Sequence, residues 1–397
     1  MLDRVTIEQL GAAAGAGPIL IALSGGGDSV ALLHLMAGHF GAARLHAAIV
    51  DHALRAGSAA DAARAAEIAG SAGVTASILT LSWAEGANRA QSAARQGRYA
   101  ALCAHARKLG ASIIATGHTR DDQAETVLLR ATRGSGWRGL AGMRALAPAP
   151  IWPEGRGLLL ARPLLGACRA ELRAWLKQRS AAWIEDPANS NPAYARVRAR
   201  TVLGDLANVG LAPTRFAALA EYLAPRLRRL DSDALQLIGR AVRFEDETIV
   251  VDPATWRGDT EVRGRALGAL IAAAGAASRM PDLGDAELTE TFTLAGALVR
   301  PGKHAIRISR DPGALAGRAD GARPLPPLAL APREEAVWDN RLALTVTEPG
   351  WSVIAENGKP VLARGAERRP VETASATWLL QPRVEHLLSR INDTKPV

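Results

Sequence analysis

The first third of the chain alternates short apolar runs with stretches of helical periodicity. The apolar runs predict strands near Pro18–Leu23, Leu45–Val50, Ala76–Leu81 and Ser112–Thr116. The stretches between them predict helices near Val30–Gly38, Ala59–Gly73 and Gln91–Leu109. This alternation is typical of an α/β fold, a doubly wound parallel sheet with helices on both faces, which binds its ligands at the carboxyl ends of the strands.

The pattern changes after about residue 210. Helices are predicted over Arg215–Leu230, Ser232–Arg243 and Glu261–Ala274, whereas Arg318–Arg333 is rich in proline and glycine, as a linker is. Beyond it, Ala336–Val346 and Trp351–Ile354 have the pattern of strands. We therefore predict an α/β domain over residues 1–210, a mainly helical, arginine-rich region over 211–320, and a small β-rich C-terminal domain over 321–397.

The first predicted strand runs into a glycine-rich loop that is typical of phosphate binding. Its residues are Ser24, Gly25, Gly26, Gly27, Asp28 and Ser29. Glycines let the backbone approach an anion, and a following helix presents its positive end to the same place. The loop lacks the Gly-Lys-Ser/Thr ending of a Walker loop and the spaced glycines of a dinucleotide site. Taken alone, it is also compatible with a plain glycine turn.

Polar residues follow the second predicted strand and line the third predicted helix. His52 and Arg55 come directly after the strand, where they can contact a nucleotide or substrate, or lie on a solvated loop. Arg95 and Arg98 lie three residues apart on one helix face, which suits a phosphate contact and equally a solvated basic face. These four residues are therefore candidate substrate or phosphate contacts.

The fourth predicted strand is followed by the richest polar cluster of the chain, Gly117 to Arg130. Asp122 and Glu125 have helical i, i+3 spacing, with Asp121 at the helix entry and His118 just before it. Capping of the helix accounts for one of these carboxylates. Three carboxylates and a histidine exceed what a cap needs, so we expect them to orient magnesium and an incoming amine.

The overall charge favours a polyanionic partner. The net charge is +9 and the estimated pI about 10.3, which points mildly to nucleic acid, although a composition biased toward arginine and alanine gives the same balance. A glycine-rich loop after the acidic cluster carries Arg133, Trp137 and Arg138. Guanidinium and indole groups both stack on bases, so this loop is a candidate RNA contact, or otherwise a flexible surface loop.

Cysteine usage and hydropathy indicate a reducing cytoplasm and no membrane. Cys103 and Cys168 are far apart and outside any Cys-x-x-Cys pair, so neither a disulfide framework nor a metal cluster is expected. The longest apolar stretch, around Leu267 to Ala277, is too short to span a bilayer. The N-terminus has no pattern of a signal peptide.

Taken together, the motifs resemble the tRNA(Ile)-lysidine synthetase family of N-type ATP pyrophosphatases. The resemblance covers about residues 17–205 and rests on blocks in the same order and spacing, namely Ser24–Ser29, Asp51–Arg55, Asn88–Tyr99, Gly117–Gly136, Arg162–Leu172 and Trp183–Asn189. One departure follows Tyr194, where Val197 stands in place of the family's usual Asn. Any side-chain hydrogen bond made by that Asn is absent here.

The resemblance implies a two-step reaction on RNA. The C2 oxygen of the wobble cytidine of tRNA(Ile) with a CAU anticodon attacks the α-phosphate of ATP, and the ε-amine of L-lysine then displaces AMP to form lysidine. It implies that the Ser24–Ser29 loop binds ATP, that Asp28 and Asp122 hold Mg²⁺, and that the region 211–320 contacts tRNA. It further implies catalytic roles for Asp28, His118, Asp121, Asp122 and Glu125, and tRNA contacts for Arg133, Arg138, Arg196 and Arg198.

Three alternatives stay open at this point. One is another tRNA modifier with the same fold, such as a thiolase, which needs cysteines better placed than Cys103 and Cys168. Another is a ligase of small molecules, which has no need of the basic loop. The third is an RNA-binding protein without catalysis, which predicts loss of the acidic residues that are present here. No protein partner is predicted, and a homodimer stays open.

Overall fold

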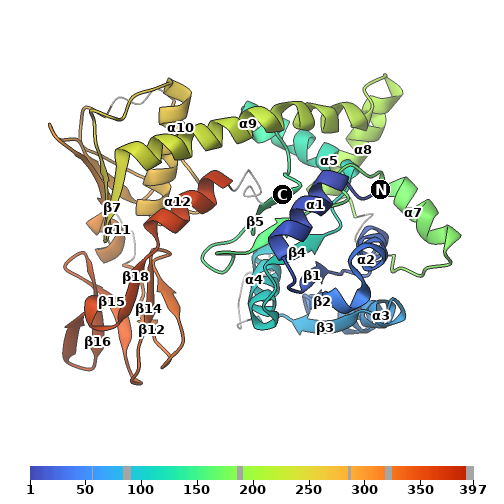
Figure 1. Cartoon of the computed structure of the whole chain (residues 1–397), viewed down its shortest axis with the longest axis horizontal. Helices are drawn as coiled ribbons and strands as arrows, with labels where there is room; N and C mark the ends of the chain where they lie inside the picture. Colours follow the sequence, from blue (N-terminus) through green and yellow to red (C-terminus); the bar gives the residue numbers. More distant parts are fainter. Residues whose placement is uncertain (56, 84–90, 186–190, 285–287, 318–323, 390–397) are drawn as a thin grey trace. The chain divides into compact units, whose positions relative to one another are not determined.

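The computed structural model describes the whole chain except residues 56, 84–90, 186–190, 285–287, 318–323 and 390–397. The described residues form two compact units, Met1–Leu227 and Arg228–Ser389. Figure 1 shows the elements of both units, coloured along the sequence. Each unit is described by itself below.

The first unit is built on a six-stranded sheet in the order β3-β2-β1-β4-β6-β5. Its strands are β1 (Ile19–Ala22), β2 (Leu45–Asp51), β3 (Thr75–Thr80), β4 (Ile113–Thr116), β5 (Leu146–Pro148) and β6 (Leu159–Ala161). Every neighbouring pair is parallel except β5 and β6, which are antiparallel. The four predicted strands and the predicted parallel sheet are confirmed, and β5 and β6 are additional strands that sequence analysis did not predict.

Alternate residues of β1 explain why both faces of this sheet are covered. Ile19 and Ile21 belong to one buried cluster, which also contains Leu32 and Leu33 of α2 (Gly27–Phe40). Leu20 belongs to a second cluster on the opposite face, together with residues of α4 (Gln91–Leu109). Because side chains of a strand point alternately to opposite faces, a continuous apolar run becomes a central, doubly covered strand.

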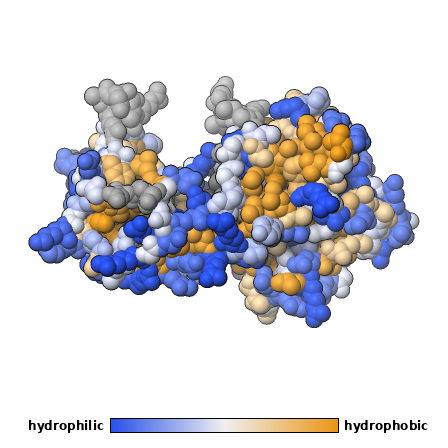
Figure 2. Space-filling view, turned by 90° about the horizontal axis from the view of Figure 1, so that it is seen from above, coloured by the Kyte–Doolittle hydropathy of each residue, from blue (hydrophilic) through white to orange (hydrophobic). Residues whose placement is uncertain are grey.

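The remaining helices of the first unit follow the sheet strands or precede them. They are α1 (Arg4–Ala14), α3 (Ser58–Ser71), α5 (Arg120–Ala131), α6 (Trp137–Leu140), α7 (Arg169–Gln178) and α8 (Ala195–Asn208). Val202 on α8 and Val209, which directly follows this helix, are exposed apolar side chains. Figure 2 shows that hydrophobic residues also gather at the surface of the first unit.

Helix α9 (Pro213–Ala241) is continuous where sequence analysis predicted two helices, so the predicted break near Asp231 is wrong. Asp231 is buried and its carboxylate accepts a hydrogen bond from Arg265 Nε at 2.7 Å. Asp231, at which the sequence predicted the end of a helix, therefore lies inside one and forms an ion pair there. No helix in the described part of the chain is long and apolar enough to cross a membrane.

The second unit contains an antiparallel sheet that sequence analysis did not predict. Its order is β7-β8-β11-β10-β9, with β7 (Val242–Glu245), β8 (Thr248–Val251), β9 (Phe292–Leu294), β10 (Ala297–Arg300) and β11 (Ile306–Arg310). The buried helix α10 (Thr260–Ala274) is confirmed. The strands are only three to five residues long, which is too short for a clear periodic signal in the sequence.

The C-terminal part is β-rich, as predicted. It consists of α11 (Pro312–Ala316), β12 (Leu328–Ala329), β13 (Ala336–Trp338), β14 (Leu342–Thr345), β15 (Ser352–Glu356), β16 (Lys359–Arg364), β17 (Glu367–Pro370), β18 (Ser375–Trp378) and α12 (Leu380–Ser389). The predicted linker is partly wrong, because β12 pairs with β15. The proposed boundaries at residues 210 and 320 stay predictions.

The buried Asp231–Arg265 pair gives a test of the second unit. Both side chains are shielded from water, with exposed fractions of 5% and 11%. Asp231→Ala leaves a buried guanidinium without this carboxylate, so we expect the free energy of unfolding of this unit to fall by about 3 kcal/mol. Urea denaturation measures the change. The control is Asp233→Ala, which removes an exposed partner of Arg229 on the same helix and costs about 0.5 kcal/mol or less. An equal loss of stability in Asp231→Ala and Asp233→Ala would contradict a stabilising role for the buried Asp231–Arg265 pair.

Candidate active site

The phosphate loop, Ser24–Ser29, connects β1 to α2 and is closed by two serine hydroxyls. The backbone N–H of Ser24 donates to Ser29 Oγ at 3.2 Å, and the two hydroxyl oxygens lie 3.0 Å apart. Ser29 Oγ also lies 2.9 Å from the carbonyl oxygen of Gly26, to which it donates. Gly26 is the N-cap of α2 and makes no side-chain cap hydrogen bond, so the first N–H groups of the helix can donate to an anion.

Close packing explains Gly25 of the loop and Gly117 beside it. Gly25 has φ +82°, and a Cβ there would lie 2.5 Å from Ile184 Cδ1. The backbone N–H of Ile184 donates to the carbonyl oxygen of Gly25 at 2.9 Å. On the other side, a Cβ on Gly117 would lie 2.9 Å from the carbonyl oxygen of Asp28. The loop is therefore held between the segment at Ile184 and the end of β4.

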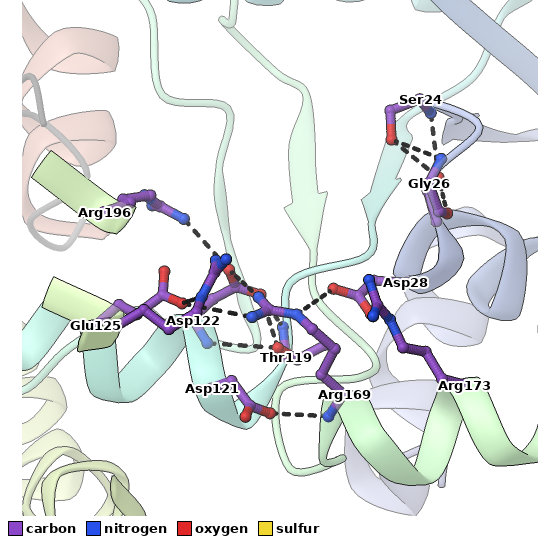
Figure 3. Close-up of polar contacts among 12 residues, drawn as sticks. Ser24, Gly26, Asp28, Thr119, Asp121, Asp122, Glu125, Arg169, Arg173 and Arg196 are labelled. Carbon is purple, nitrogen blue, oxygen red and sulfur yellow. Dashed lines mark hydrogen bonds and ion pairs between the residues drawn. The ribbon is translucent and has the colours of Figure 1, made fainter. Parts of the chain in front are cut away.

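Three of the predicted carboxylates come together beside this loop. Asp28 lies in the first turn of α2, and Asp122 and Glu125 lie on α5, which follows β4. Asp122 Oδ2 accepts hydrogen bonds from the N–H and the hydroxyl of Thr119, at 2.8 and 2.7 Å. Asp122 thus caps α5 with one oxygen and directs the other, Oδ1, toward the guanidinium groups of Arg169 and Arg196 (Figure 3).

Arg169, the first residue of α7, joins these carboxylates (Figure 3). Its Nε lies 2.9 Å from Asp28 Oδ2, one terminal nitrogen 3.0 Å from Asp122 Oδ1, and the other 3.5 Å from Glu125 Oε1. Its backbone N–H donates to Asp121 Oδ2 at 2.8 Å. Asp121 is thus also part of the site, through the backbone of Arg169.

Two arginines of α8 complete the site. Arg196 lies 3.4 Å from Asp122 Oδ1, and Arg200 Nε lies 2.9 Å from Glu125 Oε1. Sequence analysis quoted Arg169 in a matching block and gave neither Arg169 nor Arg200 a role. The signal that points to them is the acidic cluster itself, since buried carboxylates need cations nearby.

The environment shifts the pKa of each carboxyl group. Burial raises the pKa of Asp28, although Arg169 acts against this shift. Burial and the charge of Asp122 raise the pKa of Glu125, against the effect of Arg200 and Arg169. For Asp122, burial also favours the neutral acid, but Arg196 and Arg169 hold its pKa below the usual value. The three groups therefore differ in acidity within one cluster.

His118 is a neutral histidine in this structure. Burial, and after it the charge of Arg162, lower its pKa to about 3. Its Nδ1 lies 2.8 Å from the hydroxyl oxygen of Thr116 at the end of β4. A neutral imidazole offers one donor and one acceptor nitrogen, so His118 acts through hydrogen bonds rather than through charge.

The predicted substrate contacts come from the segment that follows β2 and from helix α4. Arg95 and Arg98 each lie 5.1 Å from the centre of the Tyr99 ring. Burial and the charge of Arg98 lower the pKa of His52, so His52 and Arg98 are brought near each other. Arg55 instead forms an ion pair with Asp61 of α3.

The predicted tRNA contacts divide into two groups. Arg133 is exposed and Arg138 half-buried, on the loop and short helix that follow α5. Arg196 points toward Asp122 (Figure 3), whereas Arg198 donates to the carbonyl oxygens of Pro192 and Ala193 at 2.9 and 2.8 Å. Their contact with tRNA stays a prediction. Residues 186–190, part of the matching block, lie outside the described residues.

The site contains carboxylates of the kind that bind metal ions, but no three of those described lie close enough together to share one. Within the described ranges, no three acidic, histidine or cysteine side chains are gathered closely enough to hold a metal ion. The guanidinium of Arg169 lies between the carboxylates instead. Asp28 Oδ1 and Glu125 Oε2 are buried oxygens without a hydrogen-bond partner in the structure, so the donor set matches the oxygen ligands that Mg²⁺ prefers.

Comparison with known proteins places the chain in a family. Residues 3–206 match the PP-loop domain family. The tRNA(Ile)-lysidine synthase of Caulobacter vibrioides is 35% identical over 393 residues, which cover 95% of this chain and 85% of that protein. The chain belongs to the tRNA(Ile)-lysidine synthase family. The resemblance seen in the sequence is therefore confirmed.

Two further members of the lysidine synthase family show how the similarity is distributed. The protein of Mesorhizobium japonicum is 34% identical over 363 residues, which cover 88% of this chain and 77% of that protein. The protein of Hyphomonas neptunium is 50% identical over 190 residues, which cover 47% of this chain and 50% of that protein.

The close approach of β4 to the phosphate loop gives a test. Gly117→Ala places a methyl group against the backbone of Asp28 and Ser29, which it would meet at 2.9 to 3.0 Å. Overpacking of this kind costs about 1–3 kcal/mol, so we expect ATP binding to weaken about tenfold, as measured by isothermal titration calorimetry. Gly166→Ala, with open space around its Cβ position, is the control. Unchanged ATP affinity in Gly117→Ala would show that β4 does not fix the loop.

The lowered pKa of His118 predicts a pH dependence of stability. The folded protein keeps His118 neutral down to about pH 3, whereas the unfolded chain takes up a proton below about pH 6.5. The resulting stabilisation is fully present above pH 6.5 and is lost as the pH falls toward 3. We expect the Tm of His118→Asn to fall less than that of the wild type between about pH 7 and pH 5. His39→Asn, an exposed histidine, is the control; parallel Tm curves for wild type and His118→Asn would refute the assignment.

Proposed function

We propose that the protein ligates L-lysine to C2 of the wobble cytidine of tRNA(Ile) with a CAU anticodon, consuming ATP and releasing AMP and pyrophosphate. The observation that carries this proposal is the meeting of a phosphate loop with three carboxylates at the ends of β1 and β4. Membership of the lysidine synthase family supports the reaction, and the PP-loop match supports ATP as substrate.

In the first step the phosphate loop binds ATP. The N–H groups at the start of α2 and the hydroxyls of Ser24 and Ser29 stabilise the charge that grows on the departing pyrophosphate. The C2 oxygen of cytidine attacks the α-phosphorus, an O–P bond forms, and the bond to the β-phosphate breaks. His118, neutral and fixed by Thr116, donates or accepts a hydrogen bond close to the reacting groups.

In the second step lysine must lose a proton before it attacks. A carboxylate beside the ε-ammonium holds it and takes its proton, after which the free amine attacks C2 and AMP leaves with the C2 oxygen. Glu125 suits this role because burial and the charge of Asp122 raise its pKa above the usual value, which makes it a stronger base than an ordinary carboxylate. Asp121 and Asp122 lie in the first turn of α5, the helix that also carries Glu125.

Asp28 and Asp122 are the proposed ligands of Mg²⁺. Both supply carboxylate oxygens, and Asp28 Oδ1 has no hydrogen-bond partner in the structure. When bound, the ion neutralises the phosphate oxygens of ATP.

We assign contacts to tRNA to Arg133, Arg138 and the indole of Trp137. The guanidinium of Arg226 lies over the Trp137 ring, 4.3 Å from its centre. A cytoplasmic location stays a prediction, and a homodimer stays open.

The two cysteines give no support to the thiolase alternative. Cys103 is fully buried, and burial raises the pKa of its thiol to about 12. A thiol of this acidity is almost entirely protonated near neutral pH and is a poor nucleophile. Cys168 is the N-cap of α7 and lies far from Cys103 in the sequence, so the pair does not form a motif for sulfur transfer.

The decisive test is the transfer of labelled lysine. Purified protein is incubated with ATP, Mg²⁺, radiolabelled L-lysine and tRNA(Ile) carrying CAU, with the same tRNA bearing uridine at the wobble position as control. We expect label in the first tRNA alone, with pyrophosphate released in proportion. Label in neither tRNA, or pyrophosphate released without tRNA, would argue for a ligase of small molecules.

Asp28 links the phosphate loop to the acidic cluster, so its charge should matter for the first step. We expect Asp28→Asn to lower pyrophosphate release at least about 100-fold, as is typical when a preorganised charge at a reacting phosphate is lost. Binding of tRNA, measured by filter retention, should stay within about twofold because the loop contacts ATP rather than the RNA backbone. Asp205→Asn, an exposed site on α8, serves as control. Wild-type turnover in Asp28→Asn would remove Asp28 from the mechanism.

A further inference from the structure

The guanidinium of Arg169 uses all of its nitrogen atoms on carboxylates of the site. Nε meets Asp28, and the two terminal nitrogens meet Asp122 and Glu125, at distances of 2.9 to 3.5 Å. These acids come from two different helices, α2 and α5, and the arginine comes from a third. Arg169 therefore occupies the space toward which the three carboxylates converge (Figure 3).

Burial makes this cluster depend on a cation. The exposed fractions of the side chains are 19% for Arg169, 22% for Asp28, 12% for Asp122 and 1% for Glu125. Carboxylates that are close together and shielded from water repel one another and lose hydration, so their charged forms need a neighbouring positive charge. Among the described residues, Asp28 forms an ion pair with Arg169 alone.

Two carboxylate oxygens of the cluster accept no hydrogen bond from Arg169 or from any other group that the structure describes. Asp28 Oδ1 and Glu125 Oε2 are buried and accept no hydrogen bond in the structure. Buried polar atoms are nearly always satisfied, and a carboxylate has several acceptor sites to fill. An unpartnered oxygen on a side chain as enclosed as that of Glu125 marks a place for a further cation or donor.

We propose that Arg169 is an internal counter-cation, which a cationic ligand of the reaction displaces from Asp28, Asp122 and Glu125. This inference rests on the proposed function, since it takes these carboxylates as the groups that bind the cation. The displacing ligand is a divalent metal ion or the ε-ammonium of lysine. Both are compact cations that bind carboxylate oxygens, and neither fits between the three groups while the guanidinium lies there.

Displacement has two consequences for the enzyme. The ligand-free site keeps its shape, because Arg169 offsets the repulsion that would otherwise open it. An entering cation must also compete with the contacts that the guanidinium makes to these carboxylates, so Arg169 lowers the affinity of the ligand-free site for a cation. Arg169 is thus a positioning residue, and it sets the affinity for the cation through competition.

Competition predicts tighter cation binding when the guanidinium is removed. Mn²⁺, as a probe for the metal, is titrated into the full-length protein by electron paramagnetic resonance, and L-lysine by calorimetry, both without ATP and tRNA. We expect Arg169→Gln to bind Mn²⁺, lysine or both at least about tenfold more tightly than the wild type, since charge-assisted hydrogen bonds are lost from the competing state. Tighter Mn²⁺ alone identifies the metal as the displacing ligand, and tighter lysine alone identifies the ammonium.

Arg173→Gln is the matched control. Arg173 lies one turn along α7, contributes to the field at Asp28, and pairs with Glu185 at 3.3 Å. Its removal should leave both affinities within about twofold. Equal or weaker binding in Arg169→Gln would overturn the proposal, as would an equal gain in Arg173→Gln, because the effect would then be one of general charge.

A second variant covers the case in which Arg169→Gln does not fold. Arg169→Lys keeps the charge but replaces the planar fork of three nitrogens with one ammonium on a flexible side chain, so it loses the three fixed contacts and competes less well for the carboxylates. It should still bind the probe more tightly than the wild type, and wild-type affinity would overturn the proposal. Because ATP and tRNA are absent from these titrations, failure of wild-type protein to form lysidine would refute the proposed function and leave this comparison intact.

Discussion

The balance of charge at the start of α2, α5 and α7 constrains the whole first unit. Asp28 and Asp122 lie in the first turns of their helices, where the helix dipole favours a negative charge. Arg169 is also at a helix start, where the dipole disfavours its positive charge. It stays there because three carboxylates surround it. The ion pairs therefore fix how three helices begin relative to one another.

Asp28 belongs to both parts of the site. It is a member of the phosphate loop, and its Oδ2 lies 2.9 Å from the arginine that also meets Glu125. The ATP side and the lysine side of the proposed reaction are thus connected through one residue and one guanidinium. In the proposed reaction, a cation that enters the cluster would also change the charge beside the phosphate loop, so the two chemical steps would share one electrostatic environment.

The second unit depends on buried ion pairs in a different way. Asp339 receives hydrogen bonds from Arg310 at 3.0 and 2.9 Å and from Arg341 at 2.7 Å, and Asp231 receives one from Arg265. These pairs connect α9 to α10 and strand β11 to the turn before β14. Asp231 and Arg265 are 34 residues apart and Arg310 and Asp339 are 29 residues apart, so an analysis of local periodicity treats each of these residues as a surface charge.

The sequence by itself determined the parallel sheet, the phosphate loop and the acidic cluster. Continuous apolar runs such as Ile19–Leu23 are visible locally, and Gly25 and Asp122 stand in short motifs whose chemistry follows from their spacing. Only the tertiary structure decided that Arg169 and Arg200 complete the site, that Arg55 pairs with Asp61, and that five short strands follow α9. Such partners are set by contacts between distant segments, and residue type and local spacing do not encode which arginine reaches which carboxylate.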